Sequence, residues 1–476
     1  MGMNIVVIGG GPGGYVAAVR AAQGGAKVTL IEQSKLGGTC LNNGCIPSKI
    51  LKETADLMDH FHRAGHFGIT LEGRIAPDMG RVMERKKTLI DQQIKNISNL
   101  LHHNQVTLIN GRASVKDPKM VEVKKATGET ISILWDTLVL APGTTPLEMP
   151  HLPFDGERIL SSDHLLNIQA LPQSMAILGG GVIGCEFAFI ISALGVDVTL
   201  IEAMPQIIPL PSVDPDISKI LERELKKRKI TLFTGHTVTD LKKEPNALHL
   251  TLSKWDPVVK RPLPSSSFSI TSDTLLVSVG RKPLTADLGL ETIGVHLNQR
   301  GWVNVDKYLR TNIPNVYAVG DILGPEAIML AHVAWAEGDI AAQNIMGKAV
   351  EMRYDLVPTV LFTSPEIGCA GLTEEQARAK GLNVRSDTVL FRTIAKAHIL
   401  GDIAGQAKIV SESESGKIVG VHMIGPHVDD LIAEGVMAIR MGATVTDLAT
   451  VIHAHPTLSE VMMETAFKAS GRPLHG

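Results

Sequence analysis

Two cysteines that lie five positions apart are the residues best suited to chemistry in this chain of 476 residues. Cys40 and Cys45 stand in the segment GGTCLNNGCIPSK, and the only other cysteines are Cys185 and Cys369. Four cysteines are too few for a disulfide scaffold in a chain of this length. The close pair is either a dithiol that is oxidised and reduced in turn, or two buried thiols that pack as small apolar groups.

The spacing of this pair demands a break in regular helix. Five positions on an ideal helix rise about 7.5 Å, whereas the Cα atoms of a disulfide lie roughly 4.4–6.8 Å apart. Asn42, Asn43 and Gly44, which separate the cysteines, are poor helix formers. A distorted turn at these residues would bring the two sulfur atoms together.

A duplicated βαβ unit is the element that positions this segment. Each copy consists of a short apolar strand, a glycine-rich turn, a helix of small residues and a second strand. The first copy covers residues 4–32 and is followed directly by the cysteine segment, and the second covers residues 175–202. Corresponding glycines are 170 residues apart, which indicates an internal duplication.

Each turn carries the dinucleotide-binding pattern, in which glycines allow a tight turn, close approach of a pyrophosphate and close helix packing. The residues of the pattern are Gly9, Gly11, Pro12 and Gly14 in the first copy, and Gly179, Gly181 and Gly184 in the second. Glu32 and Glu202 end the second strands, where they can accept hydrogen bonds from ribose hydroxyls. One such turn also fits an ordinary α/β sheet, but two copies in the same context predict two bound dinucleotides.

The acidic residue of the second copy also predicts which dinucleotide binds there. Glu202 would repel a ribose 2′-phosphate, and no lysine or arginine occurs from residue 203 to residue 218. The second site is therefore expected to prefer NAD to NADP.

The composition fits a folded protein that acts on small molecules. Hydrophobic residues make up 44% of the chain and charged residues 20%, so it can bury sizeable cores. With a net charge of −3 and 4% aromatic residues, nothing favours nucleic acid or an anionic membrane as a partner. We expect no membrane span and a cytoplasmic location, because no segment fits a signal peptide or a membrane helix.

Taken together, these motifs resemble the class I pyridine nucleotide–disulfide oxidoreductases, and the tail resembles the dihydrolipoamide dehydrogenase branch of that family. The further matching motifs are AVGD at 318–321, VPTVLFTSPE at 357–366 and IHAHPTLSE at 452–460. The resemblance implies an α/β fold with two Rossmann-like domains, one inserted in the other, and a C-terminal α+β dimerisation domain. The expected limits are 1–147 for FAD and the cysteine pair, 148–274 for NAD, 275–347 for the returning central segment, and 348–476 for dimerisation.

The resemblance also implies roles for individual residues. FAD would occupy the first glycine turn and NAD the second, and Cys45 would face the flavin as a thiolate while Cys40 meets the substrate. Lys49 would pair with Glu186, which otherwise lies in an apolar helix; a surface salt bridge is the alternative. The remaining expected cofactor-binding positions are Gly143, Gly280, Asp321 and Lys49 itself.

The tail motif supplies the expected acid–base residues. Residues 457–460 alone fit a capping box, in which Glu460 would serve only a helix N-terminus. The resemblance instead implies that His455 is a general base and that Glu460 orients its other ring nitrogen. In the family these residues come from the partner subunit, so a homodimer is implied. His453 is taken as structural.

The implied activity is oxidation of dihydrolipoamide, free or on a lipoylated carrier protein, in a 2-oxo acid dehydrogenase or glycine cleavage complex. A reductase of another disulfide that uses NAD(P)H is the alternative enzyme, and a catalytically idle flavoprotein subunit is the alternative of another class. Two residues depart from the family pattern, one in the helix near the expected flavin and one in the interface-domain motif, so the flavin environment is expected to differ from that of the family. Val333 follows Ala-His where lysine is common, and Phe362 stands where tyrosine is common.

Overall fold

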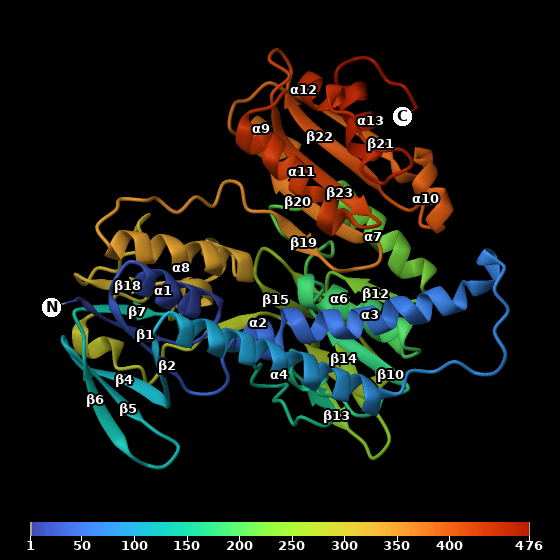
Figure 1. Ribbon diagram of the computed structural model, residues 1–476. Helices are drawn as coiled ribbons and strands as arrows, with labels where there is room; N and C mark the ends of the chain where they lie inside the picture. Colours follow the sequence, from blue (N-terminus) through green and yellow to red (C-terminus); the bar gives the residue numbers. More distant parts are fainter. Residues whose placement is uncertain (1, 476) are drawn as a thin grey trace.

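The first of two parallel sheets lies at the N-terminal end of the molecule (Figure 1). The computed structural model describes residues 2–475, apart from the side chains of residues 264 and 265. The strand order is β18-β7-β1-β2-β3, and the strands are nearly continuous apolar runs because helices cover the sheet. The strands are β1 (Asn4–Ile8), β2 (Lys27–Glu32), β3 (Thr107–Asn110), β7 (Thr137–Leu140) and β18 (Val316–Ala318), and the packed pair of helices is α1 (Pro12–Gln23) and α8 (Ala331–Ile345).

The second parallel sheet repeats this arrangement, with strand order β12-β11-β10-β16-β9. Ile8 pairs with Ile31 in the first sheet, and Leu178 pairs with Ile201 in the second, so the register is repeated 170 positions later. The predicted duplication is therefore confirmed. The elements are β9 (Ile159–Leu160), β10 (Ser174–Leu178), β11 (Asp197–Glu202), β12 (Thr231–Thr234), β16 (Thr274–Val277), α5 (Ser162–Leu165), α6 (Val182–Ala193) and α7 (Pro215–Lys227).

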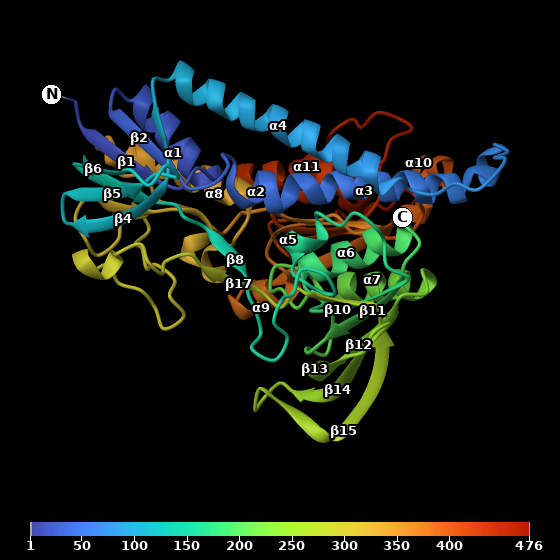
Figure 2. The same ribbon diagram turned by 90° about the horizontal axis from the view of Figure 1, so that it is seen from below.

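Small antiparallel sheets interrupt both units, and the chain crosses between the units at a two-stranded ribbon. The ribbon pairs β8 (Thr144–Pro146) with β17 (Arg281–Pro283). Figure 2 shows the sheet β13-β14-β15 projecting away from the long helices. The inserted strands are β4 (Arg112–Asp117), β5 (Met120–Lys124), β6 (Thr130–Leu134), β13 (His236–Lys243), β14 (Leu248–Asp256) and β15 (Arg261–Ser272).

The C-terminal domain is an antiparallel sheet of order β19-β20-β23-β22-β21. Helix α11 packs on β20 and β23, and α13 packs on β21 and β22. Its elements are β19 (Thr359–Leu361), β20 (Glu366–Gly371), β21 (Val384–Leu390), β22 (Gln406–Glu412), β23 (Ile418–Gly425), α9 (Glu374–Ala379), α10 (Ala395–Leu400), α11 (Val428–Met441), α12 (Val445–Thr450) and α13 (Glu460–Ala469). Short 3₁₀ helices are η1 (Ala64–Phe67), η2 (Leu290–Ile293), η3 (Gly320–Leu323), η4 (Pro325–Ala327) and η5 (Phe391–Thr393).

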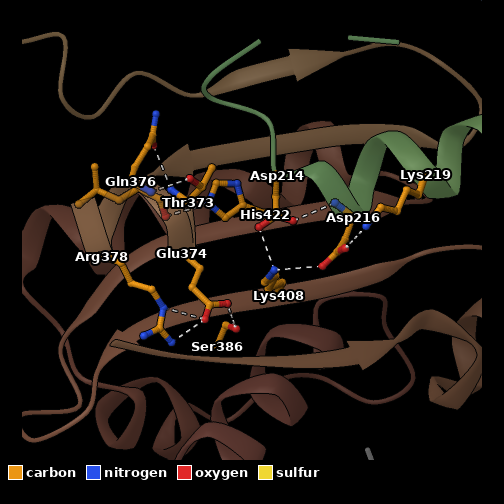
Figure 3. A network of polar contacts seen from close by, with 11 residues as sticks. Asp214, Asp216, Lys219, Thr373, Glu374, Gln376, Arg378, Ser386, Lys408 and His422 are labelled. Carbon is orange, nitrogen blue, oxygen red and sulfur yellow. Dashed lines mark hydrogen bonds and ion pairs between the residues drawn. The ribbon is translucent and has the colours of Figure 1, made fainter. Parts of the chain in front are cut away.

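A buried ion pair joins the second sheet's domain to the C-terminal domain (Figure 3). Lys408 on β22 lies 2.8 Å from Asp214 and 3.3 Å from Asp216, at the start of α7. Asp214 also caps α7, because its side chain accepts a hydrogen bond from the Asp216 backbone N–H. The same network includes the buried ring of His422. These contacts fix the orientation of α7 against the C-terminal sheet.

The cysteine segment lies in two consecutive helices, and a third helix packs against both. The helices are α2 (Gly38–Asn43), α3 (Cys45–His62) and α4 (Met79–His103). Helix α3 packs against α6 of the second sheet's domain, and α4 packs along α3 and reaches α1 and β3 of the first sheet's domain (Figures 1 and 2). Among the residues that the structure describes, no helix combines the length and the apolar character that crossing a membrane requires.

Candidate active site

The two cysteines lie on either side of a helix break. Cys40 belongs to α2, and Cys45 is the first residue of α3. Between them Gly44 has φ −155° and ψ −114°, which is not helical. A Cβ at this position would lie 3.0 Å from the backbone oxygen of Thr39. The predicted interruption of the helix between the two cysteines is confirmed.

The surroundings of the pair make the two thiols chemically unequal. A hydrogen bond from the Cys40 thiol lowers the pKa of Cys45 to about 7 against the opposing effect of burial, and Lys49 lowers it further while Glu186 raises it. The same hydrogen bond, and then burial, raises the pKa of Cys40. The N-terminus of α3 also favours a thiolate at its first residue. Near neutral pH the pair therefore holds its negative charge on Cys45.

The predicted contact between Lys49 and Glu186 is formed. Lys49 lies one helical turn beyond Cys45 on α3, and its Nζ is 2.8 Å from Glu186 Oε2. Glu186 is 7% exposed on α6, so the cation satisfies a carboxylate that would otherwise be buried alone. Its second oxygen accepts a hydrogen bond from the Phe362 backbone N–H at 3.0 Å. The ring of Phe362 faces the ammonium, with 4.1 Å from Lys49 Nζ to the ring centroid.

The two predicted ribose-binding carboxylates occupy equivalent positions. Glu32 accepts hydrogen bonds from the backbone N–H groups of Gly10 and Ser34, each at 2.7 Å. Glu202 makes the corresponding two bonds at 2.6 and 2.7 Å, and burial raises its pKa while the backbone donors oppose the rise. A carboxylate oxygen can accept two hydrogen bonds. Each carboxylate therefore retains capacity for ribose hydroxyls.

The glycine turns leave space for a pyrophosphate where the pattern requires it. Gly11 and Gly181 are the N-caps of α1 and α6, and Pro12 is the first residue of α1. A Cβ on Gly181 would meet nothing within 4 Å, and one on Gly11 would meet only Gly38, at 3.7 Å. The open approach to two helix N-termini fits two dinucleotides.

The inner glycines, in contrast, are fixed by close packing. A Cβ on Gly14 would lie 1.9 Å from the backbone oxygen of Gly9, and one on Gly184 would lie 1.8 Å from that of Gly179. No other residue fits there without moving the backbone. Each helix can therefore approach its strand closely enough to present its N-terminus to a ligand.

Asp321 begins the short helix η3 together with Gly320, next to the crossing ribbon. The Thr144 hydroxyl donates to Asp321 at 3.0 Å, and Arg281 Nε donates to that hydroxyl at 2.7 Å. Burial raises the pKa of Asp321, and Arg281 and Thr144 oppose the rise. Gly143 and Gly280 directly precede the two ribbon strands, with φ +75° and +135°.

Sequence reasoning missed two residues behind this turn. Glu337 on α8 is 1% exposed and accepts a hydrogen bond from the Gly320 backbone N–H at 2.6 Å. Its other oxygen accepts one from the Tyr354 hydroxyl at 2.6 Å. Burial raises the pKa of Glu337 to about 7, although both donors lower it. The available signal for Glu337 was a glutamate among the largely apolar residues of a helix, which is also the signal that Glu186 gives.

The tail residues are paired as the resemblance implied. His455 Nδ1 lies 2.8 Å from Glu460 Oε1, and the other carboxylate oxygen accepts the Thr457 backbone N–H at 2.9 Å. Burial would raise the pKa of Glu460, but these two contacts lower it. Helix α13 begins at Glu460 and its N-cap is Ser459, which makes no side-chain capping hydrogen bond. Residues 457–460 therefore do not form the capping box.

The two histidines of the tail differ in exposure. The ring of His453 is 5% exposed and lies 2.8 Å from Glu434, which fits the expected structural role. The side chain of His455 is 71% exposed in the single chain. Within residues 2–475 of one chain, the hydrogen bond described for His455 is to its own segment and not to the cysteine pair.

Comparison with known proteins identifies the family. A family model described as pyridine nucleotide–disulphide oxidoreductase matches residues 3–338, and the dimerisation domain of the same family matches residues 357–466. The chain belongs to this family. It is 40% identical over 476 residues to a dihydrolipoyl dehydrogenase of Chlamydia muridarum, covering 99% of this chain and 98% of the relative. A dihydrolipoyl dehydrogenase of Bacillus subtilis is 39% identical, covering 99% of this chain and 100% of the relative.

Solved structures agree over the whole chain. LpdA from Mycobacterium tuberculosis matches with a TM-score of 0.89 at 29% identity, covering 98% of this chain and 99% of that structure. The flavoprotein disulfide reductase RclA from Escherichia coli matches with a TM-score of 0.84 at 26% identity, with the same coverage. The predicted fold class is confirmed. The protein is an oxidoreductase, and its cofactors are FAD and NAD.

Proposed function

We propose that this oxidoreductase is a dihydrolipoyl dehydrogenase, which oxidises dihydrolipoamide through Cys40 and Cys45 with NAD⁺ as the final acceptor. Relatives with this activity match the chain from end to end. The position of Cys45 at the first residue of α3, one helical turn before Lys49, carries the residue assignment, because an exchange reaction needs one thiol that leaves as a stable thiolate. Cys45 is that thiol, and Cys40 is the one that bonds to substrate.

The protein side of the reaction follows from thiol exchange. His455 accepts the proton of one substrate thiol, and the resulting thiolate attacks the Cys40 sulfur of the Cys40–Cys45 disulfide. The disulfide breaks, and Cys45 leaves as a thiolate beside Lys49. The second substrate thiol then attacks the substrate sulfur of the mixed disulfide, so that Cys40 leaves with a proton and the substrate becomes a cyclic disulfide. Glu460 stabilises the protonated imidazole in the first step.

The cofactors connect this dithiol to the nicotinamide. FAD, when bound, would supply two-electron redox chemistry between this dithiol and NAD⁺. The first glycine turn with Glu32 and Asp321 would hold FAD, and the second turn with Glu202 would hold NAD. We assign residues 148–277 to NAD binding, because β16 (Thr274–Val277) belongs to the second sheet, residues 1–147 and 278–347 to the FAD-binding and central part, and residues 348–476 to dimerisation.

A homodimer would complete this site. The C-terminal domain is of the family's dimerisation type, and the exposed ring of His455 fits a role toward the cysteine pair of the other subunit. The macromolecular substrate that we propose is a lipoylated carrier protein of a 2-oxo acid dehydrogenase or glycine cleavage complex.

The test compares substrates and cofactors in the purified holoenzyme. We expect reduction of NAD⁺ with dihydrolipoamide, and a much lower rate with NADP⁺ because of Glu202. Cys45→Ser should abolish this activity, and Cys369→Ser, which changes a buried thiol remote in sequence, should retain it. Full activity in Cys45→Ser would refute the dithiol mechanism. Faster turnover of glutathione disulfide with NADPH than of lipoamide with NADH would favour the alternative enzyme.

A further inference from the structure

Phe362, the departure from the family pattern noted in the sequence, lies against the ion pair beside the redox centre. Its backbone and its side chain contact different members of that pair. The backbone N–H donates to Glu186 Oε1 at 3.0 Å, and the ring face lies 4.1 Å from the ammonium of Lys49. Phe362, which directly follows β19 in the C-terminal domain, therefore contacts both the carboxylate on α6 and the cation on α3.

The ring contact matters because the ammonium is only partly enclosed. The side chain of Lys49 is 30% exposed, and its hydrogen-bonded carboxylate is that of Glu186. A lysine ammonium sits on a flexible stem of four carbons and can leave a single partner easily. An aromatic face attracts a cation without offering a hydrogen bond, so it holds the ammonium in place and does not compete for Glu186.

The position of this ammonium affects Cys45 directly. Lys49 favours the Cys45 thiolate, whereas Glu186 disfavours it, so the two partners act in opposite directions on the same sulfur. If the ammonium moves into solvent and the buried carboxylate stays, the balance shifts against the thiolate. The backbone bond from Phe362 keeps the carboxylate in place whatever side chain stands at this position.

We propose that Phe362 is a positioning residue of the redox centre, whose ring holds the Lys49 ammonium one helical turn from Cys45 and so maintains Cys45 as a thiolate. The inference rests on the proposed function in one respect, namely that Cys45 is the thiol that must carry the charge. The ring acts on Cys45 through Lys49, which it contacts directly.

The test measures the thiolate directly in holoenzyme carrying Cys40→Ser, which leaves Cys45 as the exposed cysteine. The rate of iodoacetamide alkylation is followed from pH 5 to 9, and mass spectrometry confirms the modified residue. Phe362→Leu should raise the midpoint by about half a pH unit, the size expected for a cation–π contact at a partly exposed site. Phe362→Tyr, which keeps the ring, should restore the original midpoint, and Phe362→Met repeats the test with another apolar side chain.

A double-mutant cycle separates this role from packing alone. Lys49→Met should also raise the midpoint, and Phe362→Leu added to Lys49→Met should change it no further. An unchanged midpoint in both Phe362→Leu and Phe362→Met would overturn the proposal, as would an equal shift in Phe362→Tyr or full additivity with Lys49→Met. The proposed function fails separately, if enzyme with both cysteines does not oxidise dihydrolipoamide.

Discussion

Replacement of Lys408 by methionine should destabilise the contact between the second sheet's domain and the C-terminal domain. The side chain of Lys408 is 9% exposed and that of Asp214 is 4% exposed, so this ion pair is almost fully out of water. Methionine fills a similar volume but leaves the Asp214 carboxylate buried without its cation. Asp216 is less affected, because its side chain is 52% exposed and water screens it.

The expected loss follows from the cost of an uncompensated buried charge. Removal of one partner of a buried pair typically costs about 3 kcal/mol or somewhat more. For a domain of this size, 1 kcal/mol corresponds to roughly 2–4 °C, so the apparent Tm of Lys408→Met should fall by about 6–12 °C. Asp214→Asn combined with Lys408→Met should recover most of this loss, since asparagine can still cap α7 and carries no charge.

Thermal unfolding of the holoenzyme, followed by circular dichroism at fixed pH, checks both expectations. Lys219→Met is the matched control, because Lys219 also contacts Asp216 but is 66% exposed. It should melt within about 1 °C of the unmodified protein, as is usual for a surface ion pair. A single variant Lys408→Met that melts like the control would refute the reasoning. A double variant no more stable than Lys408→Met would show that lost packing, and not the unpaired carboxylate, caused the change.

Three further outcomes are expected at the site itself. In reduced enzyme, alkylation of Cys45 should reach half its maximum near pH 7, as its pKa of about 7 requires, and a midpoint near the ordinary thiol value of about 8.5 would contradict this. His455→Gln should lower kcat for dihydrolipoamide by about 10²–10⁴-fold without loss of bound flavin. Glu460→Gln should lower kcat by a smaller factor. A normal kcat in His455→Gln would exclude His455 as the general base. Tyr354→Phe removes the hydroxyl that donates a hydrogen bond to Glu337, which in turn holds the Gly320 backbone. FAD should therefore dissociate faster on dilution, as measured by flavin fluorescence. An unchanged rate of FAD release would show that the Tyr354–Glu337 contact does not support the turn at Gly320.

Local features of the fold could be predicted because short stretches of sequence determine them. The apolar run at residues 4–8 and the glycine turn after it specify a buried parallel strand and a helix start. Gly44 and its neighbours predicted the break between α2 and α3, since poor helix formers stand where the cysteine spacing needs them. The contact of Lys49 with Glu186 spans 137 positions and was reached only through family resemblance.

Contacts between distant, ordinary residues could not be predicted in this way. Asp214 and Lys408 are 194 positions apart, and nothing near either one distinguishes it from a solvated charge. Thr144 and Asp321 follow β7 and β18, and they meet because these two strands are neighbours in the first sheet. The ring of Phe362 was recognised as a departure, but its position over Lys49 depends on how the C-terminal domain packs against α3.

The ribbon of β8 and β17 explains how one copy of an ancestral unit could be accommodated within another. Pro146 pairs with Arg281, so the chain leaves the first sheet and returns to it at neighbouring backbone positions. The segment between Pro146 and Arg281 therefore begins and ends at adjacent positions, as the loop of a hairpin does. Its length does not alter the register of β1, β7 and β18. A segment inserted at this point leaves the core of the first sheet intact, so the two domains can differ in length without changing each other's strand pairing.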